Sequence, residues 1–249
     1  MLKDLFENIK QYEKTYGLLE DNYSQRVFSD ICEWRYSRNS SLLIDAYSLS
    51  KNKQYLEPFE RLNEEEVFVD CGGYIGDSSM DLISYAGGVE KIWLYEADDR
   101  NIKAAKDNLL GTNTNFRNVG VSDKAGELHF NGLGLSSSGF TNVTDSDYSS
   151  VRVVAIDEDI SLSEKITFLK MDIEGMELEA LRGSEQHIKK WRPVLAICLY
   201  HNSQDIWKLP LFIHSMVGES YKYYMRHYTM YHGETVLYAV PKEREINEK

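Results

Sequence analysis

One acid and three glycines follow an apolar run near the first quarter of the chain. The run ends in Asp70, and Gly72, Gly73 and Gly76 come next. Glycine lets a ligand approach the backbone closely and permits dihedral angles that other residues avoid. In sheets of alternating strands and helices, ligands bind beyond the carboxyl ends of the strands. The spacing therefore predicts a ligand-binding turn between a strand and a helix.

The spacing of these glycines favours one nucleotide cofactor over another. A dinucleotide-binding turn has the pattern G-x-G-x-x-G, but Tyr74 occupies the place of its second glycine. The pattern found is D-x-G-x-x-x-G, from Asp70 through Gly72 to Gly76. It suits S-adenosylmethionine, which has no pyrophosphate to hold and whose amino-acid part needs backbone groups and an acid nearby. We therefore predict a site for S-adenosylmethionine.

A second acid supports a nucleoside site. Glu96 ends the next apolar run, "KIWLYEADDRN", about 20 residues beyond Gly76. An acid at this strand end accepts hydrogen bonds from both hydroxyls of an adenosine ribose. Since NAD-binding enzymes use the same acid, Glu96 alone does not distinguish S-adenosylmethionine from NAD. The predicted cofactor-binding residues are Asp70, Gly72, Gly73, Tyr74, Gly76, Glu96, Ala97 and Asp172.

Two residues at strand ends are the catalytic candidates. If the methyl acceptor is an alcohol, a group must take its proton as the new bond forms. Asp172 ends the strand in "FLKMDIEG" and could bind substrate, act as the base or hold a divalent cation. His201 directly follows "PVLAICLY", and histidine titrates near neutral pH. Both are predicted catalytic residues.

Other charged residues near these strand ends have alternative roles. Glu174 and Glu177 could complement the dipole of the helix that follows them. Alternatively, Glu174 could bind magnesium together with Asp172 and a histidine. The metal is the less favoured alternative, and no metal ligand is assigned. Asp205 either orients His201 or caps a helix.

Three basic residues complete the candidates. Lys170 could meet a carboxylate. Arg226 and His227 precede the final turn, and a role at the end of a hairpin is favoured for both.

Alternating strands and helices must position these residues. From Val67 onward, they predict a mostly parallel sheet covered on both faces, with an antiparallel hairpin at one edge. The predicted strands are 67–71, 91–97, 114–122, 126–130, 151–157, 166–172, 193–200, 221–228 and 234–240. The predicted helices are 78–87, 100–110, 176–191 and 205–216. The Gly/Ser-rich loop 131–150 is either an exposed connection or a flap.

Residues 1–62 differ from the rest because apolar residues recur there at helical spacing. Helices are predicted over 2–19, 24–38 and 40–50, with Ser24 or Asp21 capping the second. An apolar helical stripe must be buried. We therefore predict a helical cap or homodimer contact over 1–62, and a cofactor-binding domain over 63–249.

Composition limits the partners and the setting. The 249 residues suit one large domain, and a formal net charge of −12 disfavours nucleic acid as substrate. The three cysteines are too few and too widely spaced to predict disulfides or zinc. Without a long apolar run or signal peptide, we expect a cytoplasmic protein that does not enter membranes.

Four segments resemble the FkbM family of S-adenosylmethionine-dependent methyltransferases. They are "FVDCGGYIGDSS", "IWLYEADDRN", "VGVSDKAGELHF" and "ITFLKMDIEGMELEALRG". The resemblance covers roughly 67–240 and implies a class I methyltransferase fold: a seven-stranded, Rossmann-like sheet with an antiparallel last strand. It also implies O-methylation, often of a sugar or natural-product hydroxyl. Cys71 and Gly73 depart from the family pattern, and residues 1–62 are expected to lie outside the shared core.

Three functions remain in competition. The favoured one is an O-methyltransferase that acts on a hydroxyl of a small molecule or sugar. The second is an NAD-dependent oxidoreductase, which the missing middle glycine opposes. The third is an interaction module that binds the cofactor without turnover and docks through its N-terminal helices.

Overall fold

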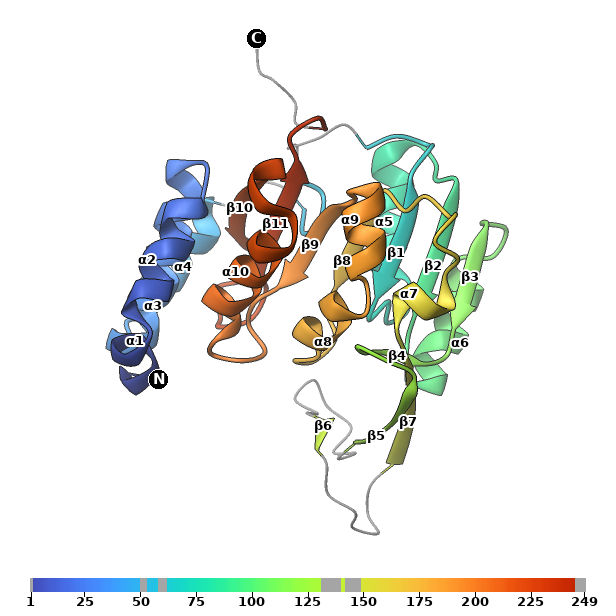
Figure 1. The fold of residues 1–249 in the computed structure, drawn as a ribbon, viewed down its shortest axis with the longest axis horizontal. Coiled ribbons are helices and arrows are strands. Elements are labelled where there is room, and N and C mark those ends of the chain that lie inside the picture. The colour runs from blue at the N-terminus through green and yellow to red at the C-terminus, as the bar shows by residue number, and fades with distance from the viewer. Residues whose placement is uncertain (1, 50–52, 58–61, 131–139, 142–148, 245–249) are drawn as a thin grey trace. The chain divides into compact units, whose positions relative to one another are not determined.

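The computed structural model describes residues 2–49, 53–57, 62–130, 140–141 and 149–244, which form two compact units (Figure 1). Residues 62–193 form one unit, and residues 1–61 with 194–249 form the other. Most of the loop predicted as a connection or flap, residues 131–150, lies outside the described residues.

Four parallel strands form the centre of the unit 62–193. Their spatial order is β8-β1-β2-β3, so the order reverses at β1. Every residue of β1 is buried, as expected of a parallel strand covered on both faces. The strands are β1 (Val67–Cys71), β2 (Lys91–Tyr95), β3 (Thr114–Arg117) and β8 (Phe168–Met171).

Helices cover both faces of these strands. Figure 1 shows α7 and α9 in front of the strands and α5 and α6 behind them. The helices are α5 (Asp77–Ala86), α6 (Asp99–Asn108), α7 (Ile156–Asp159), α8 (Glu177–Arg182) and α9 (Glu185–Trp191).

The single helix predicted over 176–191 is wrong, because α8 and α9 are separate helices. The chain bends at Gly183, whose backbone lies so close to Ser122 that a Cβ atom would be 2.1 Å from the Ser122 carbonyl oxygen. The buried Ser184 hydroxyl donates to the carbonyl of Ala180 at 2.6 Å. A tertiary contact that leaves no trace in helical periodicity therefore divides the helix.

A second, four-stranded sheet belongs to the same unit. Its order is β4-β7-β5-β6. Strands β5 and β7 form the pair that the sequence predicts, and they run antiparallel. The strand predicted over 114–122 is instead two strands, β3 and β4, in different sheets. The strands are β4 (Gly120–Val121), β5 (Gly126–Phe130), β6 (Phe140–Thr141) and β7 (Ser149–Val154).

The unit formed by 1–61 and 194–249 contains the C-terminal hairpin and the N-terminal helices. Strands β10 and β11 pair antiparallel, as do β11 and β9, which confirms the predicted hairpin. Its elements are α1 (Leu2–Glu7), α2 (Ile9–Leu18), α3 (Asn22–Ser37), α4 (Ser41–Leu49), β9 (Val194–Cys198), α10 (Asp205–Val217), a 3-10 turn at Gly218–Ser220, β10 (Tyr221–His227) and β11 (Thr235–Pro241).

The strand order β10-β11-β9-β8-β1-β2-β3 makes a seven-stranded sheet. This order confirms the predicted α/β, Rossmann-like fold of class I methyltransferases.

The N-terminal helices pack against β10, the terminal strand in that order. Helices α3 and α4 both contact β10, and α3 buries Val27, Phe28 and Ile31. Asp21 caps α3, because its carboxylate accepts the Ser24 backbone N–H at 2.6 Å. Within the described residues, the helix predicted over 2–19 breaks at Asn8 into α1 and α2. The domain boundary at residue 62 and the homodimer contact stay predictions.

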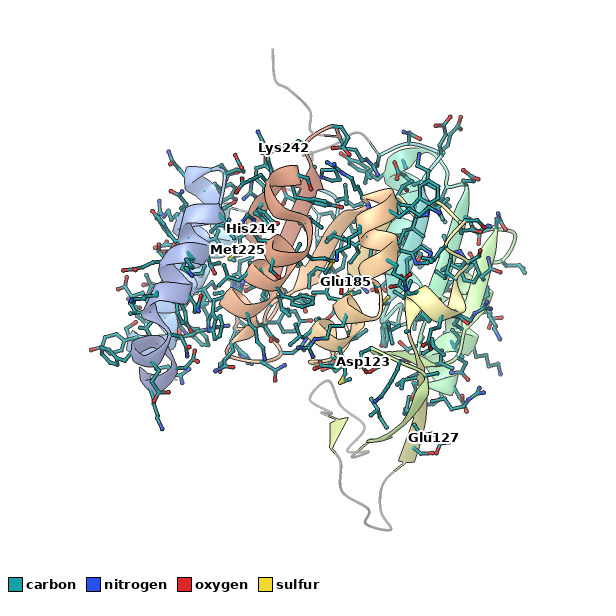
Figure 2. All side chains as sticks on the ribbon, in the orientation of Figure 1. Asp123, Glu127, Glu185, His214, Met225 and Lys242 are labelled. Atoms are coloured by element: carbon teal, nitrogen blue, oxygen red, sulfur yellow. The ribbon has the colours of Figure 1, made fainter. Side chains whose placement is uncertain are left out.

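Side chains fill the space between α10 and the hairpin (Figure 2). Met225 on β10 is fully buried, and the His214 ring of α10 lies edge-on to Tyr223 at 6.0 Å. Tyr221, Tyr223, Tyr224 and Tyr238 are also buried, so these tyrosines serve packing.

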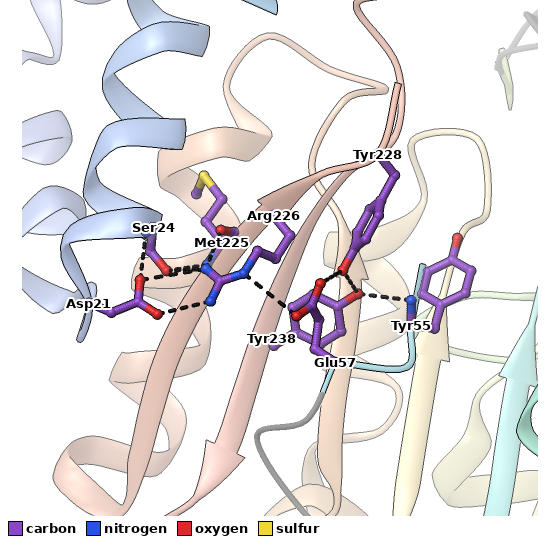
Figure 3. A network of polar contacts seen from close by, with 8 residues as sticks. All are labelled: Asp21, Ser24, Tyr55, Glu57, Met225, Arg226, Tyr228 and Tyr238. Atoms are coloured by element: carbon purple, nitrogen blue, oxygen red, sulfur yellow. Dashed lines mark hydrogen bonds and ion pairs between the residues drawn. The ribbon is translucent and has the colours of Figure 1, made fainter. Parts of the chain in front are cut away.

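A buried ionic cluster joins the start of α3 to β10 (Figure 3). Arg226 donates to the Asp21 carboxylate at 2.9 Å and to the Ser24 hydroxyl at 2.8 Å, and lies 3.7 Å from Glu57. The side chains of Arg226 and Glu57 are only 5% and 3% exposed. Burial raises the pKa of Asp21, but hydrogen bonds from Arg226 and Ser24 outweigh it and hold that pKa below its usual value.

Tyrosines extend this cluster. The Tyr228 hydroxyl donates to Glu57 at 2.6 Å and lies 2.6 Å from the hydroxyl of Tyr238. The Tyr55 backbone N–H donates to Tyr238 at 2.8 Å. Arg226, proposed from sequence as a hairpin-end residue, thus holds helix α3 and residues 53–57 on the hairpin strands.

Replacing Arg226 by methionine should destabilise the protein strongly. The variant leaves two buried or half-buried carboxylates without their cation, which costs about 3–5 kcal/mol in comparable clusters. Urea unfolding followed by circular dichroism measures the loss. The matched control is Lys222→Met on the same strand, whose ion pair with Glu20 is partly exposed and spans 3.9 Å. It should cost less than about 1 kcal/mol; equal losses in the two variants would contradict the assigned role.

Candidate functional site

The turn after β1 lies against the residue that follows β8. Gly72 has a φ of +76°, and a Cβ atom there would be 1.9 Å from the carbonyl oxygen of Asp172. That space excludes every residue other than glycine. The backbone N–H groups of Gly72 and Gly73 both donate to the Tyr95 carbonyl, at 2.9 and 3.0 Å. The turn is therefore fixed between β2 and β8, where strand order reverses.

The other two glycines also meet neighbours in this unit. A Cβ atom on Gly73 would lie 2.4 Å from the Leu94 side chain, so glycine at this position makes room for Leu94. Gly76 has a φ of +83° and is the N-cap of α5. A Cβ atom there would lie 3.0 Å from Leu109 of the α6 end. The glycines thus keep the turn close to the helices behind it.

Two backbone amides hold the Glu96 carboxylate. The Tyr74 N–H donates to one oxygen at 3.0 Å, and the Asp98 N–H donates to the other at 2.7 Å. Tyr74 has a φ of +45°, uncommon for a residue with a side chain, and its side chain is 53% exposed. Burial raises the pKa of Glu96, although these amides act in the opposite direction. The carboxylate is therefore oriented before any ligand arrives.

Two polar residues that the sequence analysis missed support Glu96 and Ala97. The Asn118 amide donates to the carbonyls of Glu96 and Ala97, at 3.1 and 3.2 Å. Asp98 caps α6 by accepting the Arg100 N–H at 2.8 Å. Asn118 directly follows β3, and its position one residue past a strand is the signal that could have identified it.

Beneath the turn lies a buried ion pair. The Lys170 ammonium is 3.0 Å from one oxygen of Asp70 and donates to the Gly72 carbonyl at 2.7 Å. The hydroxyls of Ser78 and Ser79 donate to the other Asp70 oxygen, at 2.6 and 2.7 Å. This confirms the prediction that Lys170 could meet a carboxylate. Since both oxygens of the fully buried Asp70 are bonded inside the protein, its side chain supports the turn from below.

The loop after β8 carries the acids of the "MDIEGME" segment. Asp172 is half-buried, and its N–H donates to the Cys71 carbonyl at 3.0 Å. Glu174 is exposed, with a φ of +56°. Glu177 is buried and accepts the Ile173 N–H at 2.9 Å, so it closes this loop at the start of α8. Among the described residues, no three His, Cys, Asp or Glu side chains gather as a metal site would require.

His201 belongs to the unit that contains the C-terminal hairpin. It is half-buried just after β9, and its ring centre lies 4.2 Å from that of Tyr200. Asp205 begins α10 and accepts the Asn202 N–H at 2.8 Å, so it supports the turn that carries His201. His227 is buried and bonded to Thr235 at 2.9 Å. Burial lowers the pKa of His227 to about 4.

The structure gathers most predicted cofactor residues at the carboxyl ends of three neighbouring strands. Gly72, Gly73 and Tyr74 follow β1, Glu96 and Ala97 follow β2, and Asp172 follows β8. Their roles as ligand-binding or catalytic groups, and that of His201, stay predictions.

Residues 70–228 match the Methyltransferase FkbM domain. The chain belongs to the FkbM methyltransferase family. A crystal structure of methyltransferase FkbM from Methylobacillus flagellatus superposes with a TM-score of 0.80 at 26% identity. The superposition covers 95% of this chain and 60% of that one, so this chain spans less than two thirds of that relative. Among curated proteins, none matches the chain significantly.

The family model matches residues 70–228 and therefore does not include residues 1–62. The FkbM structure nevertheless leaves only 5% of this chain uncovered, a share too short to contain residues 1–62. Most of the N-terminal helical segment therefore has a counterpart in that FkbM methyltransferase.

Two more distant solved structures have TM-scores below 0.5. An rRNA methylase from Streptococcus thermophilus gives 0.47 at 13% identity, covering 73% of this chain and 89% of that one. Fibrillarin from Aeropyrum pernix, solved with S-adenosyl-L-methionine bound, gives a TM-score of 0.46 at 11% identity, covering 79% of this chain and 74% of that one.

Replacing Gly72 by alanine should disrupt the turn. The new Cβ atom would overlap the Asp172 carbonyl, and the positive φ adds strain, so we expect a loss of several kcal/mol in unfolding free energy. Gly87→Ala is the matched control, because Gly87 has a similar φ of +79° but nothing within 4 Å of its Cβ position. It should lose only about 1–2 kcal/mol. Thermal unfolding of both variants measures the difference, and equal losses would refute the close contact.

Proposed function

We propose that the chain is an enzyme that transfers the methyl group of S-adenosylmethionine to a hydroxyl of a small molecule. The observation that carries the proposal is the Glu96 carboxylate, held by the N–H groups of Tyr74 and Asp98 beside the glycine turn. A carboxylate fixed at the end of the second strand suits the two hydroxyls of an adenosine ribose.

The residues at the strand ends fit the donor groups of this cofactor. Glu96 would accept the ribose hydroxyls, and the backbone of Gly72, Gly73 and Tyr74 would face the amino-acid part. When bound, the cofactor supplies an activated methyl group and its leaving group. The protein's contribution is then alignment, because a preorganised site removes the entropic cost of bringing acceptor and donor together.

An alcohol acceptor requires a group that takes its proton. Asp172 is half-buried after β8, and His201 is half-buried after β9. Each carries a group able to accept a proton, and we propose these two as the candidates for the base. A divalent cation is not part of the proposal.

The acidity of the chain supports a small acceptor. The formal net charge is −12, and it includes exposed acids such as Asp123, between β4 and β5, and Glu127 on β5 (Figure 2). Such a surface repels nucleic-acid phosphates. We propose a small-molecule hydroxyl acceptor, with sugars as the first class to test, and a cytoplasmic location. In the described part of the chain, no helix could cross a membrane.

Calorimetric titration with S-adenosylmethionine tests the cofactor. Glu96→Ala should weaken binding about a hundredfold, because two hydrogen bonds to a charged acceptor are lost. Since burial raises the Glu96 pKa above its usual 4.5, wild-type affinity should fall as pH is lowered toward that raised pKa. Glu96→Gln should flatten this dependence. Binding of NADH in place of S-adenosylmethionine, or no effect of either variant, would contradict the proposal.

Transfer to an acceptor is tested with a radiolabelled methyl donor. A panel of sugars and other hydroxyl compounds, assayed with and without EDTA, should yield a labelled product in both conditions. Asp172→Asn or His201→Gln should then lower kcat about a hundredfold, and the variant that removes the base should also lose the acidic limb of the pH profile. Binding without any labelled product from panel or cell extract would instead favour an interaction module.

A further inference from the structure

We propose that Lys170 is a positioning residue that fixes the glycine turn and, through it, the carboxylate of Glu96. This inference rests on the proposed cofactor site. Lys170 itself lies beneath the turn, with a side chain only 4% exposed, and it acts through the backbone of the turn.

The peptide group between Gly72 and Gly73 is held from both sides. Its carbonyl accepts the Lys170 ammonium at 2.7 Å, and its N–H donates to the Tyr95 carbonyl at 3.0 Å. A peptide group is planar, so bonds at opposite edges fix the orientation of the whole plane. Glycine, which has wide backbone freedom, would otherwise let this plane rotate.

The fixed peptide determines where the next amide points. The Tyr74 N–H, one peptide further along, donates to Glu96 at 3.0 Å. A continuous series of hydrogen bonds thus leads from Lys170 on β8, through the turn after β1, to the acid that follows β2. The ammonium is positioned in turn by Asp70, at 3.0 Å.

Asp70 is held by a second set of bonds. Lys170 pairs with Oδ1 of Asp70, and the hydroxyls of Ser78 and Ser79 on α5 donate to Oδ2. Bonds from two sides leave the carboxylate, and hence the ammonium, little freedom. Asp70 therefore contributes to cofactor binding through Lys170 and the turn, and a single substitution of either residue would leave a buried charge uncompensated.

The double variant Asp70→Asn with Lys170→Met separates positioning from stability. It removes both buried charges, and the asparagine still accepts hydrogen bonds from the serine hydroxyls. The Gly72 carbonyl nevertheless loses its donor. We expect the double variant to unfold closer to the wild-type temperature than Lys170→Met alone. Its affinity for S-adenosylmethionine should still be at least about tenfold weaker, the loss expected for one charged hydrogen bond.

Lys91→Met is the matched control. Lys91 is a partly buried lysine on the neighbouring strand β2, paired with Glu164 at the opposite, amino-terminal end of the strand. The Lys91→Met substitution replaces the same side chain by the same residue away from the turn, so affinity for S-adenosylmethionine should stay within about twofold of wild type.

Amide hydrogen exchange of the peptide containing residues 72–74 gives a readout without cofactor. The double variant should exchange at least about tenfold faster there, while Lys91→Met should match wild type. A folded double variant with wild-type exchange at this turn would overturn the positioning role of Lys170, whether or not the cofactor binds. If wild type itself fails to bind S-adenosylmethionine, the proposed function fails, and the exchange comparison still decides the role of Lys170.

Discussion

The close approach of Gly72 to the Asp172 carbonyl is the constraint on which the site depends. A Cβ atom at residue 72 would be 1.9 Å from that oxygen, so the two loops touch through backbone alone. Contact through backbone leaves no rotamer to change, and interiors packed this tightly resist small displacements. The glycine turn, Tyr74 and the loop after β8 consequently occupy fixed positions relative to one another. A site built this way is rigid where parallel strands end.

Each unit also contains a buried basic side chain that is paired with neighbouring carboxylates. In one, Lys170 meets Asp70 and a backbone carbonyl; in the other, Arg226 meets Asp21 and Glu57. Buried ion pairs contribute little net stability, because desolvation offsets their attraction. Their value here lies in geometry, since a charged donor accepts few alternative arrangements. One cluster fixes a turn at the strand ends, and the other fixes helices on a hairpin.

The order of helices and strands could be predicted from the sequence, but the places where a tertiary contact breaks a helix could not. Alternation of apolar runs located β1, β2, β8, β9 and the hairpin, because burial on both faces leaves a strong pattern. It did not predict the break at Gly183, which results from contact with Ser122, a residue about 60 positions earlier in sequence. The glycine turn and Glu96 were located from spacing alone. Ser78, Ser79 and Asn118 were missed, because their partners are set by folding and not by neighbours in sequence.

The ionic cluster at Arg226 has a consequence for how the protein is made. Asp21 and Ser24 are separated from their partners on β10 by more than 200 positions. A ribosome therefore releases helix α3 long before β10, the strand that α3 contacts, has been synthesised. During synthesis the surface of α3 that contacts β10 stays uncovered until β10 emerges. The last strands to be translated complete the packing of the first helices.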